Sequence, residues 1–174
     1  MSAWKSIFIL ENISASLNIQ IEKNEAIGLL AMYLGMKIDI FQNFNEFSKQ
    51  ILPLLNAVIN DRNIQEICHD DRLIILHLAF LTHCSVIGNI RQRGTWPSTV
   101  KVFGVCKYPG CQAMAYHKDH IWPHSLGGPF EVWNFQGLCD FHNRMKSNSP
   151  VFNFSPDGNF QTGLKNWLKA RQWI

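Results

Sequence analysis

Two short pairs of metal-ligating residues constrain the fold of this chain more than any other feature. Cys106 and Cys111 flank a Pro-Gly turn in the stretch CKYPGC, and Cys139 and His142 are three positions apart in CDFH. A Pro-Gly turn lets two sulfurs converge, and residues three apart share one face of a helix. The four residues form a Cys3His set, which suits a closed, tetrahedral, structural zinc site. Such an ion stabilises a module that is too small to hold its own core. The alternative, four ordinary buried residues, leaves the paired spacing unexplained.

The other cysteines and histidines fit a different interpretation. The cysteine count of five is odd, and the N-terminus lacks the basic and apolar stretches of a signal peptide. We therefore expect a cytoplasmic protein without a disulfide framework, in which closely spaced cysteines bind metal. Cys68 and Cys84 lie among aliphatic residues and are interpreted as buried free thiols. His69, His77 and His83 are interpreted as polar members of the same helical region.

The first 90 residues are predicted to be mostly helical. Apolar residues recur at helical spacing over residues 22–36 and 43–60, and Pro53 should start, kink or end a helix. A third helix should begin at Asp70 or Asp71 as its N-cap and end at Gly88. Residues 91–100 are rich in Gly, Pro, Ser and Thr, which predicts a linker.

After the linker the pattern changes to short extended runs, a turn-rich loop and a helix that begins near CDFH. We expect residues 101–150 to form one module. Residues 151–174 contain a PDG turn between aromatic segments, which predicts a hairpin, followed by a short basic helix with Thr162 as its N-cap. The predicted fold class is α+β: a helical region over residues 1–90, the linker, a zinc-braced module, and the C-terminal hairpin and helix.

Charge is divided unequally along the chain. Residues 1–90 hold six Lys/Arg and nine Asp/Glu, a net charge of −3, while residues 91–174 hold ten and four, a net charge of +6. A basic half beside an acidic half favours a polyanionic partner on one side of the protein. The longest apolar run, residues 73–87, is short and contains two histidines, so we expect no membrane span.

The segment between the two metal-ligating pairs is unusually rich in reactive side chains. It contains His117, Asp119, His120, His124 and Asn134, and Asn143 follows directly after the second pair. A carboxylate can bind a hard cation such as Mg²⁺, and a neighbouring histidine can take a proton from water. Successive residues of a strand point to opposite faces, so Asp119 and His120 can divide these two roles.

The pattern C-x4-C … DHIWPHSLGG … WNFQGLCDFHNRMKSN resembles that of the HNH endonucleases, also called ββα-metal nucleases. The shared features are an Asp-His pair with a proline three residues later, a Gly-Gly loop, a middle Asn, and then C-x2-[CH]-N-R-x-K. The resemblance covers about a quarter of the chain, residues 106–149, and does not extend to residues 1–100. It implies two strands and a helix around an active site, braced by zinc.

The resemblance also implies a role for each matching residue. His120 matches the general base that activates water, and Asp119 with Asn143 matches the ligands of a catalytic Mg²⁺ or Mn²⁺. Asn134 matches the residue that ties the loop by backbone hydrogen bonds and keeps the histidine oriented. The cysteines and His142 match the zinc ligands. His142 is the alternative to Asn143 for the final catalytic position, but its spacing from the preceding cysteine favours zinc.

Four further side chains are candidates for nucleic-acid contact, and a solvated or structural role is the alternative for each. They are Arg144, Lys146, His117 and His124. Basic residues outside this segment would extend the surface for phosphate, namely Arg91, Arg93, Lys165, Lys169 and Arg171. Four tryptophans are expected in the core rather than stacked on bases, namely Trp122, Trp133, Trp167 and Trp173.

The sequence therefore predicts a metal-dependent DNA endonuclease of restriction, phage or defence type, acting on double-stranded DNA. Its expected mechanism uses one metal ion and leaves 5′-phosphate and 3′-hydroxyl ends. A single site cuts one strand, so a double-strand break would need a homodimer or two successive nicks. The alternatives are a non-catalytic, zinc-stabilised nucleic-acid binding module, or a nuclease that acts on RNA or structured DNA.

Overall fold

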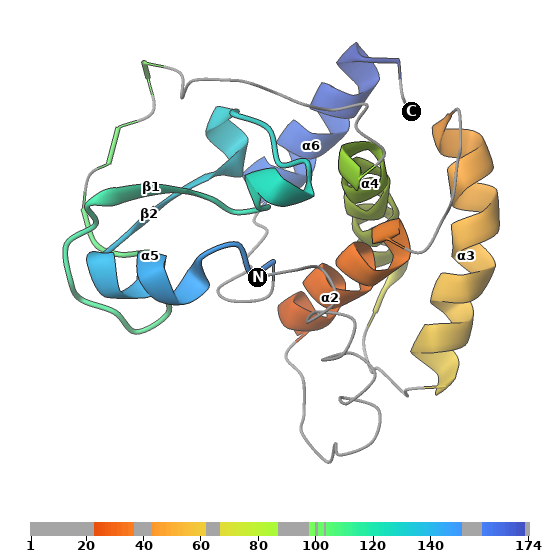
Figure 1. Ribbon diagram of the computed structural model, residues 1–174, viewed down its shortest axis with the longest axis horizontal. Helices are drawn as coiled ribbons and strands as arrows, with labels where there is room; N and C mark the ends of the chain where they lie inside the picture. The colour runs from red at the N-terminus through yellow and green to blue at the C-terminus, as the bar shows by residue number, and fades with distance from the viewer. Residues whose placement is uncertain are drawn as a thin grey trace.

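The computed structural model describes residues 23–36, 43–61, 67–86, 98–99, 101–102, 104–150 and 158–172. Three helices come first, followed by two short strands with 3₁₀ turns between them and then two more helices (Figure 1). The elements are α2 (Lys23–Met36), α3 (Phe44–Asp61), α4 (His69–Val86), β1 (His117–His120), η1 (His124–Leu126), η2 (Val132–Asn134), β2 (Phe135–Leu138), α5 (Asp140–Lys146) and α6 (Gly158–Ala170). The predicted α+β class is confirmed: the chain is helix-rich with one small antiparallel sheet.

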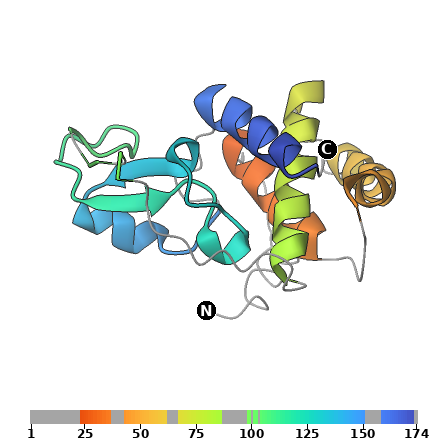
Figure 2. The same cartoon turned by 90° about the horizontal axis from the view of Figure 1, so that it is seen from above.

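The helical part is built around α4, which lies between α3 and the sheet in both views (Figures 1 and 2). The buried face of α3 repeats every four residues, at Phe47, Ile51, Leu55 and Ile59. Helices α2 and α4 approach closely because Gly35 has no side chain: a Cβ there would collide with the backbone of α4. The helical prediction for this region is confirmed over its described residues.

Two details of these helices differ from the sequence-based expectations. Helix α4 begins one residue before Asp70, and Asp71 is not the N-cap. The Asp71 carboxylate instead accepts a hydrogen bond from the backbone N–H of Cys68 at 2.9 Å and pairs with Lys23 at 2.8 Å. Helix α3 neither begins nor ends at Pro53. The proline lies inside the helix, at an exposed position. Gly88 and most of the predicted linker lie outside the described residues.

The sheet is a hairpin-like pair whose strands are joined by a 14-residue loop spanning residues 121–134. The register places His117 opposite Leu138, Asp119 opposite Gln136 and His120 opposite Phe135. Helix α5 follows β2 directly and packs along one face of the pair (Figure 2). The observed order is strand, loop, strand and helix. The sequence placed both of its extended runs before the loop, so a strand was expected at β1 but not at β2, which follows the loop.

The loop between the strands is braced by the helical part. The hydroxyl of Thr82 in α4 donates to the carbonyl of Leu126 at 3.4 Å, and that of Ser85 donates to the carbonyl of Ser125 at 3.5 Å. Gly127 adopts φ +86°, and a Cβ there would collide with the carbonyl of Leu81. The described helices and the module therefore support one another.

The C-terminal prediction is wrong in two respects. Gly158, expected in the turn, and residues 159–161, expected in the second arm of a hairpin, form the first turn of α6. Thr162 lies inside that helix rather than at its N-cap. The reason is tertiary: Phe160 is fully buried, and with Leu164, Trp167 and Leu168 it forms a helical stripe that packs on the rest of the protein. Residues 151–157, which hold the rest of the predicted hairpin, lie outside the described residues.

One hydrophobic core runs through both parts of the chain. Ile121 and Trp122 of the module and the apolar stripe of α6 join the same buried cluster as α2, α3 and α4. A second, small cluster contains Cys106, Leu138 and Cys139. As expected, Trp122 and Trp167 are core residues. Within the described ranges, no helix has the length and apolar character needed to cross a membrane.

Candidate functional site

The four predicted zinc ligands come together at one end of the sheet. The Sγ atoms of Cys106, Cys111 and Cys139 and a ring nitrogen of His142 lie within 4.8 Å of one another. His142 Nδ1 is 3.3 Å from Cys139 Sγ and 3.5 Å from Cys106 Sγ. In a tetrahedral zinc site, ligand atoms about 2.0–2.3 Å from the metal are roughly 3.5 Å apart. The donor set and its spacing therefore fit a metal ion, and zinc is the ion that Cys3His sets favour.

Local backbone structure explains why these ligands converge. The chain reverses at Gly110, which has φ +76°, and Cys111 N–H donates to the carbonyl of Tyr108 at 3.1 Å. Cys139 is the N-cap of α5, so that His142 lies in its first turn on the same side. The ring of Tyr108 stacks on that of His142 at 3.9 Å and so fixes its orientation.

The surroundings of Cys106 lower the pKa of its thiol. Burial by itself raises the pKa of this thiol, but backbone N–H groups of Cys139 and Tyr108, with smaller effects from the His142 and Cys139 side chains, lower it to about 7. Hydrogen bonds donated to the sulfur stabilise its charged form. Because metals bind the thiolate rather than the thiol, this environment favours metal binding near neutral pH.

Asp119 lies on the face of β1 that packs against α5. Its Oδ2 is 3.0 Å from Lys146 Nζ and accepts a 2.7 Å hydrogen bond from Gln136 Nε2. Burial raises the pKa of Asp119 and lowers that of Lys146, while each charge opposes the shift of the other. The Asp119 carboxylate therefore already has a cationic and an amide partner in this structure.

His120 turns to the opposite side of β1, as strand alternation predicts. Its ring lies 4.7 Å from that of Phe130, edge to face, and 5.7 Å from that of His124. Burial, followed by the charges of His124 and Lys146, lowers the pKa of His120 to about 4. The imidazole is therefore neutral near neutral pH, which is the form that can accept a proton.

Asn134 is fully buried and holds the loop that follows His120. Its Oδ1 accepts a hydrogen bond from the backbone N–H of Trp122 at 2.7 Å. Its Nδ2 donates to the carbonyls of Trp122 at 3.0 Å and Pro129 at 3.1 Å. These are the loop-tying backbone hydrogen bonds expected of this residue.

Asn143 is half buried and lies one turn before Lys146 on α5, so the two residues share a helix face. Lys146 contacts Asp119, which places Asn143 on the side of α5 that faces β1. Within the described residues, the only group of three or more His, Cys, Asp or Glu ligands close enough to hold a metal is the Cys3His cluster.

The four residues predicted to contact nucleic acid occupy different environments. Arg144 and His117 both pair with Asp140, at 2.8 Å and 3.2 Å, on the outer part of the module. His124 is exposed in η1. The expectation for Lys146 is wrong in this conformation, because the residue is 1% exposed and its ammonium is enclosed with Asp119. An amphipathic helix with few residues gives no sequence signal that distinguishes such a lysine from a surface one.

Gln136 is the site residue that the sequence analysis missed. It lies directly across from Asp119 in the register and binds its carboxylate, and it is itself 6% exposed. The available signal was a polar residue in an otherwise buried short strand, two positions after Asn134.

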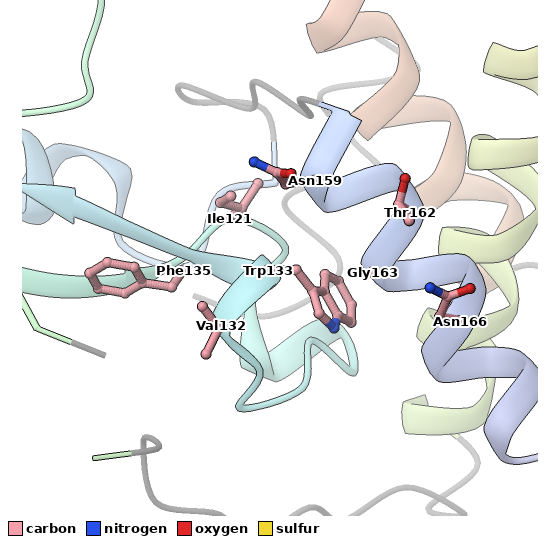
Figure 3. Close-up of a pocket in the computed structure, with 8 residues that line it drawn as sticks. All are labelled: Ile121, Val132, Trp133, Phe135, Asn159, Thr162, Gly163 and Asn166. Carbon is pink, nitrogen blue, oxygen red and sulfur yellow. The ribbon is translucent and has the colours of Figure 1, made fainter. Parts of the chain in front are cut away.

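A groove of about 540 Å³ lies beside the module, between the start of β2 and α6 (Figure 3). Its lining carries no charged residue and consists of Ile121, Val132, Trp133, Phe135, Asn159, Thr162, Gly163 and Asn166. Figure 3 shows the Trp133 side chain directed toward α6 at Gly163. The polar groups of this lining are therefore amides and a hydroxyl, together with the indole of Trp133.

Comparison with family models, with curated proteins and with solved structures finds no match to this chain. The resemblance to HNH endonucleases therefore rests on the sequence motifs alone.

Proposed function

We propose that this chain is a metal-dependent endonuclease of the HNH type that hydrolyses phosphodiester bonds in DNA. The observation that carries the proposal is that a neutral, half-buried His120 follows Asp119 on one strand, and that Asp119 contacts α5, the helix that also carries His142 of the Cys3His cluster. Burial keeps the His120 imidazole in its neutral form, which is the form that can accept a proton, while the lowered pKa makes it a weaker base than an exposed histidine.

In the proposed mechanism, each residue of the module has a separate task. His120 accepts the proton of the attacking water, and Asn134 holds the following loop so that the imidazole keeps its orientation. Asp119 and Asn143 would hold one Mg²⁺ or Mn²⁺, which supplies charge stabilisation for the phosphate and the leaving oxygen when bound. The Cys3His cluster would hold zinc and fix α5 relative to the strands. The expected ends are a 5′-phosphate and a 3′-hydroxyl.

Nicking of supercoiled plasmid by the zinc-loaded protein, with and without added Mg²⁺, tests this function. We expect His120→Ala to lower the nicking rate by roughly a hundredfold or more, as for loss of a general base. The matched control is His69→Ala, because His69 is exposed at the start of α4. Equal nicking by wild type and His120→Ala, with intact zinc content in both, would remove His120 from the mechanism.

A non-catalytic, zinc-stabilised nucleic-acid binding module is the second candidate. The observation that favours it is the ion pair of Asp119 with Lys146, since an ammonium already neutralises the acid that a cation would need. Under this alternative the protein shifts labelled DNA in a gel but never nicks plasmid at any Mg²⁺ or Mn²⁺ concentration. Nicking that depends on Asp119 excludes it.

A further inference from the structure

Lys146 is a charged side chain in a place where lysine is seldom found. It is 1% exposed, although it belongs to the last turn of a short surface helix. Its ammonium is 3.0 Å from Asp119 Oδ2 and donates to the carbonyl oxygen of His120 at 2.8 Å. Lys146 therefore reaches from α5 to two consecutive residues of β1.

The same carboxylate oxygen receives a second donor. Gln136 Nε2 donates to Asp119 Oδ2 at 2.7 Å, so two donors meet at one oxygen. The Asp119 side chain is 12% exposed, which leaves little water to screen its charge. A divalent cation that binds Asp119 must then share the carboxylate with an enclosed ammonium only a few ångströms away.

A residue that contacts a metal ligand can either strengthen or weaken the binding of the metal ion. A hydrogen-bonding partner that only orients a ligand strengthens metal binding, and its loss typically weakens affinity by about 10- to 100-fold. A buried positive charge, in contrast, repels a divalent cation strongly because poorly solvated charges are poorly screened. Gln136 already provides an uncharged orienting contact to Asp119, so the charge of Lys146 is its distinguishing contribution.

We propose that Lys146 is an internal counter-ion that competes with divalent cations for Asp119 and so weakens metal binding at this site. The inference rests on the proposed function, since it takes Asp119 as the residue that binds the catalytic cation. The resident ammonium keeps the buried carboxylate paired when no metal is bound. Metal binding then requires an ion concentration high enough to overcome the ammonium.

The test measures Mn²⁺ binding to zinc-loaded protein by calorimetry, with Asp119→Asn as the background for other sites. We expect Lys146→Met to bind Mn²⁺ at least about tenfold more tightly than wild type, because the repelling charge is gone. The control is Lys118→Met, which also removes one positive charge, but from an exposed position of β1, the strand that carries Asp119. Its Mn²⁺ affinity should stay within about twofold of wild type, since water screens a surface charge.

Thermal unfolding provides a second readout. Without Mn²⁺, Lys146→Met should unfold at a lower temperature than wild type, because Asp119 is left buried without its ammonium. Added Mn²⁺ should raise the unfolding temperature of this variant more than that of wild type. If the methionine variant does not fold, Lys146→Gln removes the same charge while keeping a hydrogen-bond donor, and the same gain in affinity is expected.

The outcomes separate this inference from the proposed function. Equal or weaker Mn²⁺ binding by the uncharged variants overturns the competition, while wild type that nicks plasmid in an Asp119-dependent way still upholds the nuclease. Absence of Asp119-dependent Mn²⁺ binding in every variant overturns both. Tighter binding by Lys146→Met or Lys146→Gln, with Lys118→Met unchanged, supports the internal counter-ion.

Discussion

The indole of Trp133 packs directly on the backbone of Gly163, so that the module and the C-terminal helix meet without a side chain between them (Figure 3). The same indole lies edge to face with Phe160 at 5.4 Å and with Trp167 at 6.5 Å. Trp133 belongs to η2, immediately before Asn134 and β2. Helix α6 therefore supports the segment that holds the loop after His120.

Gly163→Ala is expected to destabilise the protein, because a Cβ there would overlap the Trp133 ring. Overpacking of this kind costs about 1–3 kcal/mol, which exceeds the gain of roughly 0.5–1 kcal/mol from replacing a helical glycine. The measurement is urea unfolding. Gly158→Ala is the matched control, since it lies in the first turn of α6 with open space around it. A Gly163→Ala protein as stable as Gly158→Ala would mean that Trp133 does not pack on α6.

Asn134→Ala is expected to cost roughly 3 kcal/mol of folding stability. The substitution removes three hydrogen bonds and leaves the buried N–H and carbonyl of Trp122 and the carbonyl of Pro129 without their partner. Chemical unfolding measures the loss, and plasmid nicking should fall with it because the loop after His120 is released. Asn166→Ala, on the exposed side of α6, should change neither quantity appreciably. An Asn134→Ala protein of unchanged stability would contradict the described hydrogen bonds.

Local spacing predicted much of the structure. The Cys-x4-Cys turn and the Cys-x2-His helix start each bring two ligands together, because each pair is fixed by a few neighbouring residues. The structure then brings the two pairs into the one cluster that the donor set predicted. The buried stripe of α3 followed from its four-residue period. The loop-tying role of Asn134 came from the resemblance to a known family, and its hydrogen bonds agree with that role.

Features that depend on distant contacts could not be predicted in this way. The burial of Lys146 and its ion pair with Asp119 require α5 to lie on β1, and a lysine in a basic helix otherwise indicates a solvated surface. The PDG signal suggested a hairpin, but the burial of Phe160 against Trp133 favours a helix over residues 158–170. A core shared by the helical part and the module is likewise invisible in a one-dimensional pattern.

Cys139→Ala is expected to abolish zinc binding. The purified wild type should contain about one zinc ion per chain, measured by elemental analysis, and the variant close to none, because a structural site needs all four ligands. Loss of the ion should also expose the module to limited proteolysis. Cys68→Ser is the control. Contrary to the expectation of a buried thiol, Cys68 is exposed before α4, and serine is a favourable residue at a helix start. Full zinc content in Cys139→Ala would exclude the Cys3His cluster as the metal site.

His77 should make the stability of the protein depend on pH. Burial, with a smaller effect from Lys165, lowers the pKa of His77 to about 4, whereas in the unfolded chain it is about 6.5. Between these values the unfolded chain binds a proton that the folded protein does not, so stability is complete above pH 6.5 and is lost as the pH falls toward 4. At pH 5 this amounts to about 2 kcal/mol.

His77→Phe removes the titrating group while keeping an aromatic ring next to Phe44, whose ring centroid lies 5.1 Å from that of His77. We expect the free energy of unfolding to fall less between pH 7.5 and pH 5 in this variant than in wild type, by about 2 kcal/mol. The measurement is urea unfolding at both pH values. His69→Phe, at an exposed position of the same helix, should retain the wild-type fall. A fall in His77→Phe equal to that of wild type would show that the His77 ring is not buried against α3.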